Sequence, residues 1–138
     1  MDSLSKLMAT GADHPLPCQE YWKIAMKPRL APGIPVGIVE GNNCFEDREA
    51  FLFARKYTSP TIFKTLGDWD FREELRNVPV HTLVVHGTEE AIPMDMVEEW
   101  VNYLPNGRLE KIENAAHFPQ LEQPGIVWPM IEGFLEGK

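Results

Sequence analysis

Serine and cysteine are scarce in this sequence, which limits the chemistry that the chain can perform. Its serines are Ser3, Ser5 and Ser59, and none lies in the G-x-S-x-G pattern that presents a nucleophilic serine on a sharp strand-to-helix turn. The two cysteines, Cys18 and Cys44, are too few for a disulfide framework. They indicate reduced structural thiols, as in a cytoplasmic protein.

Basic residues and long apolar runs are lacking as well. The sequence has 21 acidic and 13 basic residues, a formal net charge of -8, which argues against nucleic acid or an anionic membrane as a partner. No apolar run approaches the roughly 20 residues of a membrane span. The first residues, MDSLSKLMATGADHP, contain no apolar signal segment. We therefore expect a cytoplasmic protein, and no motif predicts a cofactor or a metal.

The 138 residues suffice for one domain with a buried core, preceded by a less regular segment. Residues 1–33 are rich in proline, so we expect irregular structure with one short helix over residues 20–26. From residue 34 onward the pattern is regular. IPVGIVEG, residues 34–41, predicts a short buried strand, and a helix capped by Asn43 follows until Pro60 stops it.

The last part of the chain alternates strands and helices. HTLVVHG is an apolar strand suited to burial on both faces, and RLEKIEN is a charged edge strand. The helix between them, MDMVEEWVNYLP, and the last helix are amphipathic. Pro129 is compatible with the last helix only in its first turn. Expected inner faces are Met96, Val97, Trp100, Val101 and Leu104 on the first helix, and Val127, Ile131, Phe134 and Leu135 on the second.

This alternation predicts an α/β fold with a short parallel sheet of about three strands, flanked by helices. In such sheets ligands bind outside the carboxyl ends of the strands. Two loops leave those ends here, GTEEAIP and NAAHFPQLEQP. If the two late strands are neighbours, Glu89 or Glu90 would face His117, and a small-molecule ligand could bind between the loops. His81 and His86 are interpreted as structural.

Several motifs together resemble the C-terminal part of α/β-hydrolases, in particular the proline iminopeptidase-like and esterase-like branch. They are LGDWDFREEL, TLVVHGTEEAIP, LPNGRLEKIENAAHFPQLEQP and IEGFLEG. The resemblance implies a partial α/β-hydrolase fold over residues 34–138, with lid-like helices over residues 43–77. It implies a catalytic acid three residues after the glycine of HG, which is Glu90, with Glu89 as the alternative. His117 aligns with the catalytic histidine. The family usually has aspartate at the acid position.

The resemblance leaves the nucleophile missing. Cys44 follows a predicted strand and opens a predicted helix, so it is the remaining candidate, although Phe45 would crowd it. The family's oxyanion-hole segment is missing too. The sequence thus predicts an α/β-hydrolase family protein, for ester or amide substrates, that is inactive as a lone chain.

Two alternatives stay open at this point. One is a non-catalytic binding or oligomerisation domain. The other is a half-enzyme completed by a partner chain that carries G-x-S-x-G. An apolar strand with an open edge, PVGIVEG or HTLVVHG, also predicts a homodimer, because exposed strand edges pair with other chains.

Overall fold

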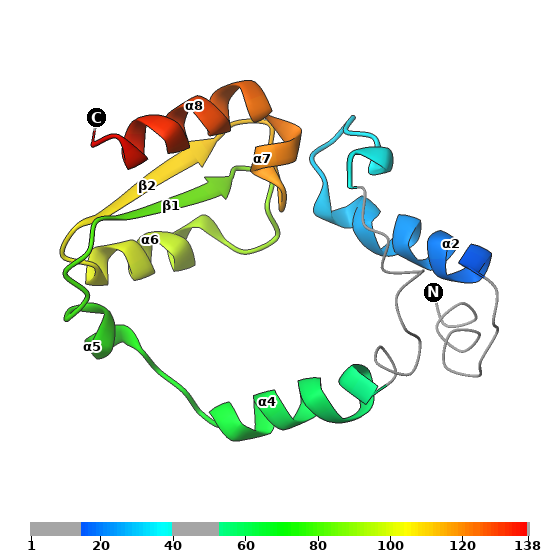
Figure 1. Ribbon diagram of the computed structural model, residues 1–138, viewed down its shortest axis with the longest axis horizontal. Helices are drawn as coiled ribbons and strands as arrows, with labels where there is room; N and C mark the ends of the chain where they lie inside the picture. The colour runs from blue at the N-terminus through cyan, green and yellow to red at the C-terminus, as the bar shows by residue number, and fades with distance from the viewer. Residues whose placement is uncertain (1–14, 40–52, 138) are drawn as a thin grey trace. The chain divides into compact units, whose positions relative to one another are not determined.

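A computed structural model of the chain describes residues 15–39 and 53–137 (Figure 1). The backbone forms two compact units, each built from two stretches of sequence. One unit is Met1–Ala25 with Glu40–Trp69, and the other is Met26–Val39 with Asp70–Lys138. These ranges do not coincide with the expected division into residues 1–33 and 34–138.

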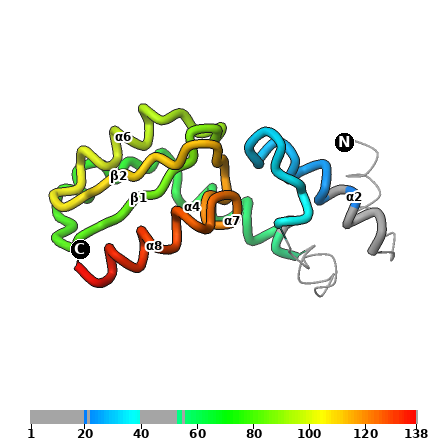
Figure 2. The backbone as a smooth tube through the Cα atoms, turned by 90° about the horizontal axis from the view of Figure 1, so that it is seen from above, coloured from blue at the N-terminus to red at the C-terminus, as the bar shows by residue number. Residues whose placement is uncertain are grey.

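The second unit contains a two-stranded parallel sheet. Strand β1 is Thr82–Gly87 and strand β2 is Gly107–Ile112. Their register runs from Thr82 opposite Gly107 to Gly87 opposite Ile112. Helix α6 covers one face of the sheet and helix α8 the other, as Figures 1 and 2 show. The predicted short parallel sheet flanked by helices is therefore confirmed.

The apolar faces of the two helices each contribute to the core of this unit. Helix α6, Met94–Tyr103, buries Val97. Helix α8, Pro124–Leu135, buries Val127, whose exposed fraction is 1%. Val127 packs with Ile112 and Ala115, and partly buried apolar residues from β1 and α8 surround them: Val85, Met130 and Ile131. Amphipathic patterning thus packs the first turn of α8 near the end of the sheet that carries the two loops.

Four residues of these helices depart from expectation. Pro129 lies inside α8, beyond the first turn. Pro129 lacks an N–H for the carbonyl of Gly125, and both residues are exposed, so water can bind that carbonyl instead. Leu135 is 77% exposed because α8 ends there, and the expected inner residues Met96 and Trp100 of α6 are 51% and 53% exposed.

The segment IPVGIVEG does not form the expected strand in its described part. Val36–Ile38 is a 3-10 helix, η2, and residues 40 and 41 lie outside the described range. Pro35 precedes this turn, and its carbonyl accepts the N–H of Ile38 at 3.2 Å. The described residues thus contain two strands where about three were expected.

The Pro-rich N-terminal stretch is more helical than expected. Helix α2 spans Pro15–Met26 and begins five residues before the predicted helix. Its prolines Pro15 and Pro17 lie in the first turn, where a missing N–H leaves no intrahelical bond unmade. A 3-10 turn, η1, follows at Lys27–Arg29.

The lid-like region is helical in its described part. A π-turn, η3, spans Ala54–Thr58, and α4 continues it as Ser59–Leu66. Pro60 does not stop the helix, because it directly follows the π-turn, in which the N–H of Ser59 donates to the carbonyl of Ala54 and the hydrogen-bond spacing is changed. Helix α5, Arg72–Leu75, belongs to the other unit. The predicted cap Asn43 lies outside the described residues.

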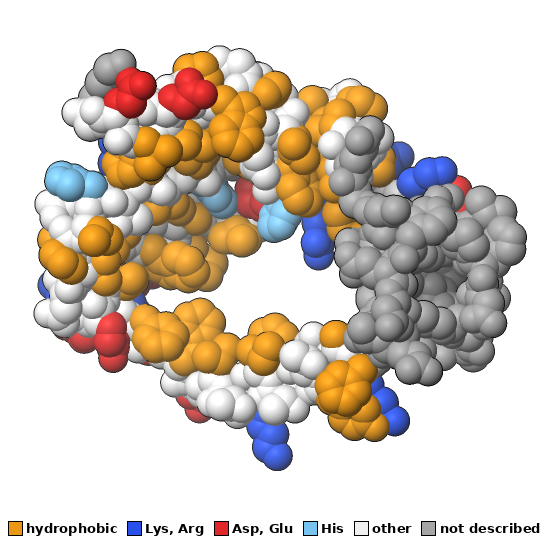
Figure 3. All heavy atoms as spheres, viewed as in Figure 1, with side chains coloured by type: hydrophobic (Ala, Val, Ile, Leu, Met, Phe, Trp, Pro, Cys, Tyr) orange, Lys and Arg blue, Asp and Glu red, His pale blue; other side chains and the backbone are white. Residues whose placement is uncertain are grey.

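Large apolar side chains are exposed along α4. Figure 3 shows apolar side chains gathered over this helix. Its exposed apolar residues include Phe63, whose exposed fraction is 73%, and Ile62, at 52%. None of the helices described here combines the length and the apolar composition that crossing a bilayer requires.

Candidate active site

The loops after β1 and β2 are bonded directly to each other. Beyond the end of β1, the N–H of Thr88 donates to the carbonyl of Ile112 at 3.0 Å, and the N–H of Glu89 donates to the carbonyl of Ala115 at 2.9 Å. Gly87 permits this approach, because a Cβ there would lie 2.2 Å from the carbonyl oxygen of Ala115. Because Gly87 has no side chain, the two loops can approach each other this closely.

His117 follows β2 after a tight turn. Asn114 has a φ of 55°, the left-handed conformation that Asn adopts more readily than most residues. Ala115 and Ala116 are buried, with exposed fractions of 0% and 3%. Small residues are required here because the loop packs against the end of β1. The turn then directs His117 toward the loop after β1.

The side chains of Glu90 and His117 form a short hydrogen bond. The distance from His117 Nδ1 to Glu90 Oε2 is 2.6 Å. Because a carboxylate oxygen only accepts, Nδ1 carries the hydrogen, and Nε2 lies on the opposite edge of the ring. The Glu90 side chain is 8% exposed, and that of His117 is 41% exposed. The acid is therefore enclosed while the imidazole can be reached from outside.

The second oxygen of Glu90 is bound by its own loop. Oε1 accepts the N–H of Ala91 at 2.7 Å and that of Ile92 at 3.4 Å. Burial raises the pKa of the Glu90 carboxyl. The hydrogen bonds from His117, Ala91 and Ile92, together with the charge of His117, outweigh that effect and bring the pKa below its ordinary value of 4.5. Glu90 is therefore ionised at neutral pH, as the partner of an imidazole must be.

The other expected acid is not part of this pair. Glu89 is exposed, and the carboxylate that bonds His117 belongs to Glu90. The methylene that glutamate has beyond aspartate does not prevent the contact. Of the two cysteines, Cys18 lies in α2 and Cys44 lies outside the described residues.

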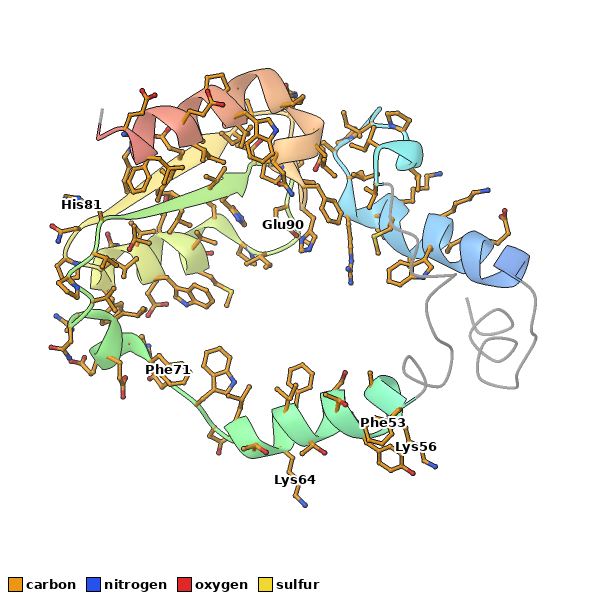
Figure 4. All side chains as sticks on the ribbon, in the orientation of Figure 1. Phe53, Lys56, Lys64, Phe71, His81 and Glu90 are labelled. Atoms are coloured by element: carbon orange, nitrogen blue, oxygen red, sulfur yellow. The ribbon has the colours of Figure 1, made fainter. Side chains whose placement is uncertain are left out.

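The two histidines interpreted as structural lie at opposite ends of β1. Nε2 of His86 lies 3.0 Å from the carbonyl oxygen of Ile92, which closes the loop that carries Glu90. His81 is exposed and precedes β1, while Glu90 lies beyond the other end of the strand (Figure 4). His86 therefore supports the acid loop, and His81 lies away from it.

Sequence reasoning missed one residue of the site, Glu122. Its side chain is buried, with 7% of the residue exposed, and its carboxylate accepts the backbone N–H groups of Ala31, Ala116 and Phe118. In the sequence it reads as one more surface glutamate in PQLEQP. The one available signal was position, since a glutamate in the turn after Phe118 can reach back to the start of that turn.

A nucleophile positioned at Nε2 of His117 could transfer its proton to the imidazole. The carboxylate of Glu90 would then stabilise the imidazolium through the bond at Nδ1. The described part of the chain contains no group of three or more His, Cys, Asp or Glu residues that could hold a metal ion. The arrangement is one in which a carboxylate orients an imidazole for proton transfer.

No family model and no curated protein sequence matches the chain. Several solved structures are similar to the chain. A serine hydrolase from the polyaromatic hydrocarbon-degrading bacterium Cycloclasticus zankles has a TM-score of 0.64 at 17% identity, covering 86% of this chain and 45% of its own. A serine hydrolase involved in carbazole degradation has a TM-score of 0.65 at 17% identity, covering 87% and 48%.

A third similar structure is 2-hydroxy-6-oxo-6-phenylhexa-2,4-dienoate hydrolase from Rhodococcus sp. strain RHA1. Its TM-score is 0.56 at 16% identity, and the match covers 96% of this chain and 48% of that enzyme. The chain thus spans about half the length of the solved hydrolases that it matches. Such low identities establish architecture rather than activity. The chain has part of the α/β-hydrolase fold.

Proposed function

We propose that this chain supplies the acid and the general base of an α/β-hydrolase active site, with Glu90 and His117 in those roles. The observation that supports this function is the 2.6 Å hydrogen bond from His117 Nδ1 to Glu90 Oε2. It leaves Nε2 on the side of the ring away from Glu90, where proton transfer from a nucleophile can take place. In an ordinary surface ion pair both side chains are exposed, whereas here the acid is enclosed and only the base is exposed.

The proposed reaction is hydrolysis by acyl transfer. The oxygen of a serine hydroxyl attacks the substrate carbonyl while its proton moves to Nε2 of His117. That proton then passes to the leaving alcohol or amine as the carbon–heteroatom bond breaks. Water next attacks the acyl-enzyme and loses a proton to the same nitrogen. The bond from the acyl carbon to the serine oxygen then breaks, that oxygen takes the proton back from Nε2, and the carboxylic acid is released. Glu90 stabilises the imidazolium in both halves of the reaction.

A serine nucleophile would have to come from outside these 138 residues, because no serine in them lies in G-x-S-x-G. Such a motif could lie on a second polypeptide or on a further part of a longer chain. The chain alone would then be inactive. Esters or N-terminal prolyl amides are the proposed substrates, in line with the proline iminopeptidase-like and esterase-like motifs.

A serine-directed fluorophosphonate probe tests this function. The purified chain should not be labelled, and it should not hydrolyse a p-nitrophenyl ester. Affinity purification of the tagged chain from its native cells should recover a protein that the probe labels. That protein should be either a second polypeptide or a longer form of this chain. The ester hydrolysis of that complex should be lost in His117→Ala and retained in His81→Ala, an exposed histidine at the other end of β1.

Two results would contradict the assignment. Hydrolysis by the repurified lone chain that disappears in His117→Ala would place the nucleophile within the 138 residues. Activity of the recovered complex that is unchanged in His117→Ala would remove His117 from the mechanism.

The second candidate function, association with another chain, is favoured by apolar surface on the sheet unit. On α6, Met96 and Trp100 lie one turn apart and are 51% and 53% exposed, and Ile92 just before the helix is 49% exposed. Within the described residues, β1 pairs only with β2, so its other edge has no partner strand. Both features favour a dimer or pairing with a complementary hydrolase half.

Light scattering at low micromolar concentration distinguishes these states. A mass of about twice 15.8 kDa would support the homodimer. A mass near 15.8 kDa would exclude it and leave the complementary half as the proposed partner. Trp100→Lys should return a dimer to the monomer mass, whereas Trp128→Lys on α8, also about half exposed, should leave the dimer intact.

A further inference from the structure

Glu122 is the buried charged residue next to the proposed base. Among the described residues, Glu122 is the one polar or charged residue that is buried as a whole. A carboxylate removed from water needs hydrogen-bond donors to compensate for lost hydration. Glu122 has three, and all of them are backbone N–H groups. It therefore binds the main chain rather than a cation.

Two of those donors belong to the residues on either side of His117. Oε1 of Glu122 accepts the N–H of Ala116 at 3.1 Å and the N–H of Phe118 at 2.9 Å. The N–H of His117 itself donates to the carbonyl of Arg29 at 3.1 Å. Three consecutive N–H groups are thus bound, which fixes the backbone from which the imidazole projects.

The third donor connects this loop to a distant part of the chain. Oε2 of Glu122 accepts the N–H of Ala31 at 2.7 Å. Ala31 is 3% exposed, and its neighbour Leu30 is 9% exposed. Together with the Arg29 carbonyl, this bond docks residues 29–31 against the histidine loop. One carboxylate therefore holds two segments that are 91 residues apart.

We infer that Glu122 positions the general base, so that Nδ1 of His117 stays on Glu90. This role rests on the proposed function of His117. A bond of 2.6 Å tolerates little displacement of either partner. Glu90 is fixed by N–H groups of its own loop, whereas His117 depends on Glu122 for the backbone on both sides. Removal of Glu122 should release the imidazole while Glu90 keeps its place.

Side-chain NMR of His117 tests this role without requiring turnover. In the wild-type chain the neutral imidazole should carry its proton on Nδ1, with a low-field signal for the proton that it shares with Glu90. Glu122→Ala should lose this signal and redistribute the proton between the two ring nitrogens. Glu113→Gln, an exposed glutamate that precedes the same turn, is the control for loss of one negative charge.

Glu122→Gln separates the hydrogen bonds of one carboxylate oxygen from that of the other. An amide has one accepting oxygen, so it can serve Ala116 and Phe118 or serve Ala31, but not both. The amide group has nearly the volume of the carboxylate, and this variant carries the test if the alanine variant does not fold. We expect it to weaken the low-field signal and to shift it toward the value of a solvated imidazole.

The outcomes separate this inference from the proposed function. A wild-type chain without the Nδ1–H form of His117 would contradict the proposed acid–base pair. A wild-type chain with that form, and folded Glu122→Gln and Glu122→Ala variants that keep it as Glu113→Gln does, would overturn the positioning role. A purely structural Glu122 would lower the melting temperature and leave the tautomer of the folded protein unchanged.

Discussion

The acid loop and the histidine loop are joined by two backbone hydrogen bonds and by the side-chain bond between Glu90 and His117, but different interactions fix these two side chains. The carboxylate of Glu90 is bound by the next two residues, Ala91 and Ile92, and the loop is closed by His86. All of these contacts are local in sequence. The histidine loop instead depends on Glu122 and on Arg29, which belongs to a separate segment of the chain.

The difference matters because local and remote contacts respond differently when another part of the chain is changed. A loop fixed by its own N–H groups keeps its conformation when distant parts of the chain change. A loop fixed by a buried carboxylate loses several bonds at once when that carboxylate is removed. The proposed base is therefore the more vulnerable half of the pair, and four substitutions can measure this.

The largest effect is expected for Glu122→Ala. It leaves the N–H groups of Ala31, Ala116 and Phe118 without their acceptor. An unsatisfied buried donor costs about 1–3 kcal/mol. Because water can enter part of the vacated space, we expect the free energy of unfolding to fall by roughly 4 kcal/mol. Urea unfolding of the variant and of Glu113→Gln measures it, and a loss below about 1 kcal/mol would show that the carboxylate is dispensable.

A somewhat smaller loss is expected for Gly87→Ala. The new methyl carbon would lie 2.2 Å from the Ala115 carbonyl oxygen and 2.5 Å from that of Ala116, and backbone atoms cannot rotate away. The loops must separate, so we expect about 3 kcal/mol of destabilisation, at the upper end for overpacking. Gly133→Ala in α8, where an added Cβ meets nothing within 4 Å, should instead stabilise the helix by up to about 1 kcal/mol. Equal effects of the two substitutions would contradict this account.

The acid loop was the part of the site most open to prediction from sequence. An apolar run followed by GTEEAIP places carboxylates at the carboxyl end of a strand, and parallel pairing brings His117 to the same end. The choice between Glu89 and Glu90 follows from the family resemblance, and the structure places Glu90 against the imidazole. The apolar run of a buried strand and the loop residues that follow it are short-range features, and sequence patterns report those well.

The supporting contacts could not be predicted in the same way. The bond from Ala31 to Glu122 joins residues 91 positions apart, and no periodicity links them. Val36–Ile38 illustrates the same limit, since its apolar residues match a strand pattern but form a 3-10 turn after Pro35. Whether an apolar run pairs as a strand depends on an available neighbour, which local composition does not encode.

The acid itself can be tested through pH. Glu90→Gln removes the charge that binds His117, and hydrogen bonds to charged groups contribute roughly 1.5–3 kcal/mol. Because the His117 side chain is 41% exposed, solvent screening favours the lower value, about 1.5 kcal/mol at pH 7. The folded-state pKa of Glu90 lies below its ordinary value of 4.5, so this contribution is present above pH 4.5.

As the pH falls below 4.5 and through the lower folded-state pKa, the carboxyl binds its proton and the contribution is lost. The difference in unfolding free energy between wild type and Glu90→Gln should therefore shrink between pH 7 and pH 3. Glu89→Gln, an exposed neighbour, serves as the control. A difference that stays constant over this range would show that the ionised carboxylate contributes nothing to the fold.

The smallest effect is expected for His86→Ala, which tests whether the acid loop is as independent as its local contacts indicate. A carbonyl oxygen only accepts, so Nε2 of His86 donates to Ile92 across 3.0 Å. Loss of this one neutral hydrogen bond should cost about 1 kcal/mol. The N–H groups of Ala91 and Ile92 should still fix Glu90, so the low-field Nδ1–H signal of His117 should persist. His81→Ala, the same change at the other end of β1, should alter stability by less than about 0.5 kcal/mol. Loss of the His117 signal in His86→Ala would mean that the N–H groups of Ala91 and Ile92 do not suffice to fix Glu90, and the contrast between the two loops would disappear.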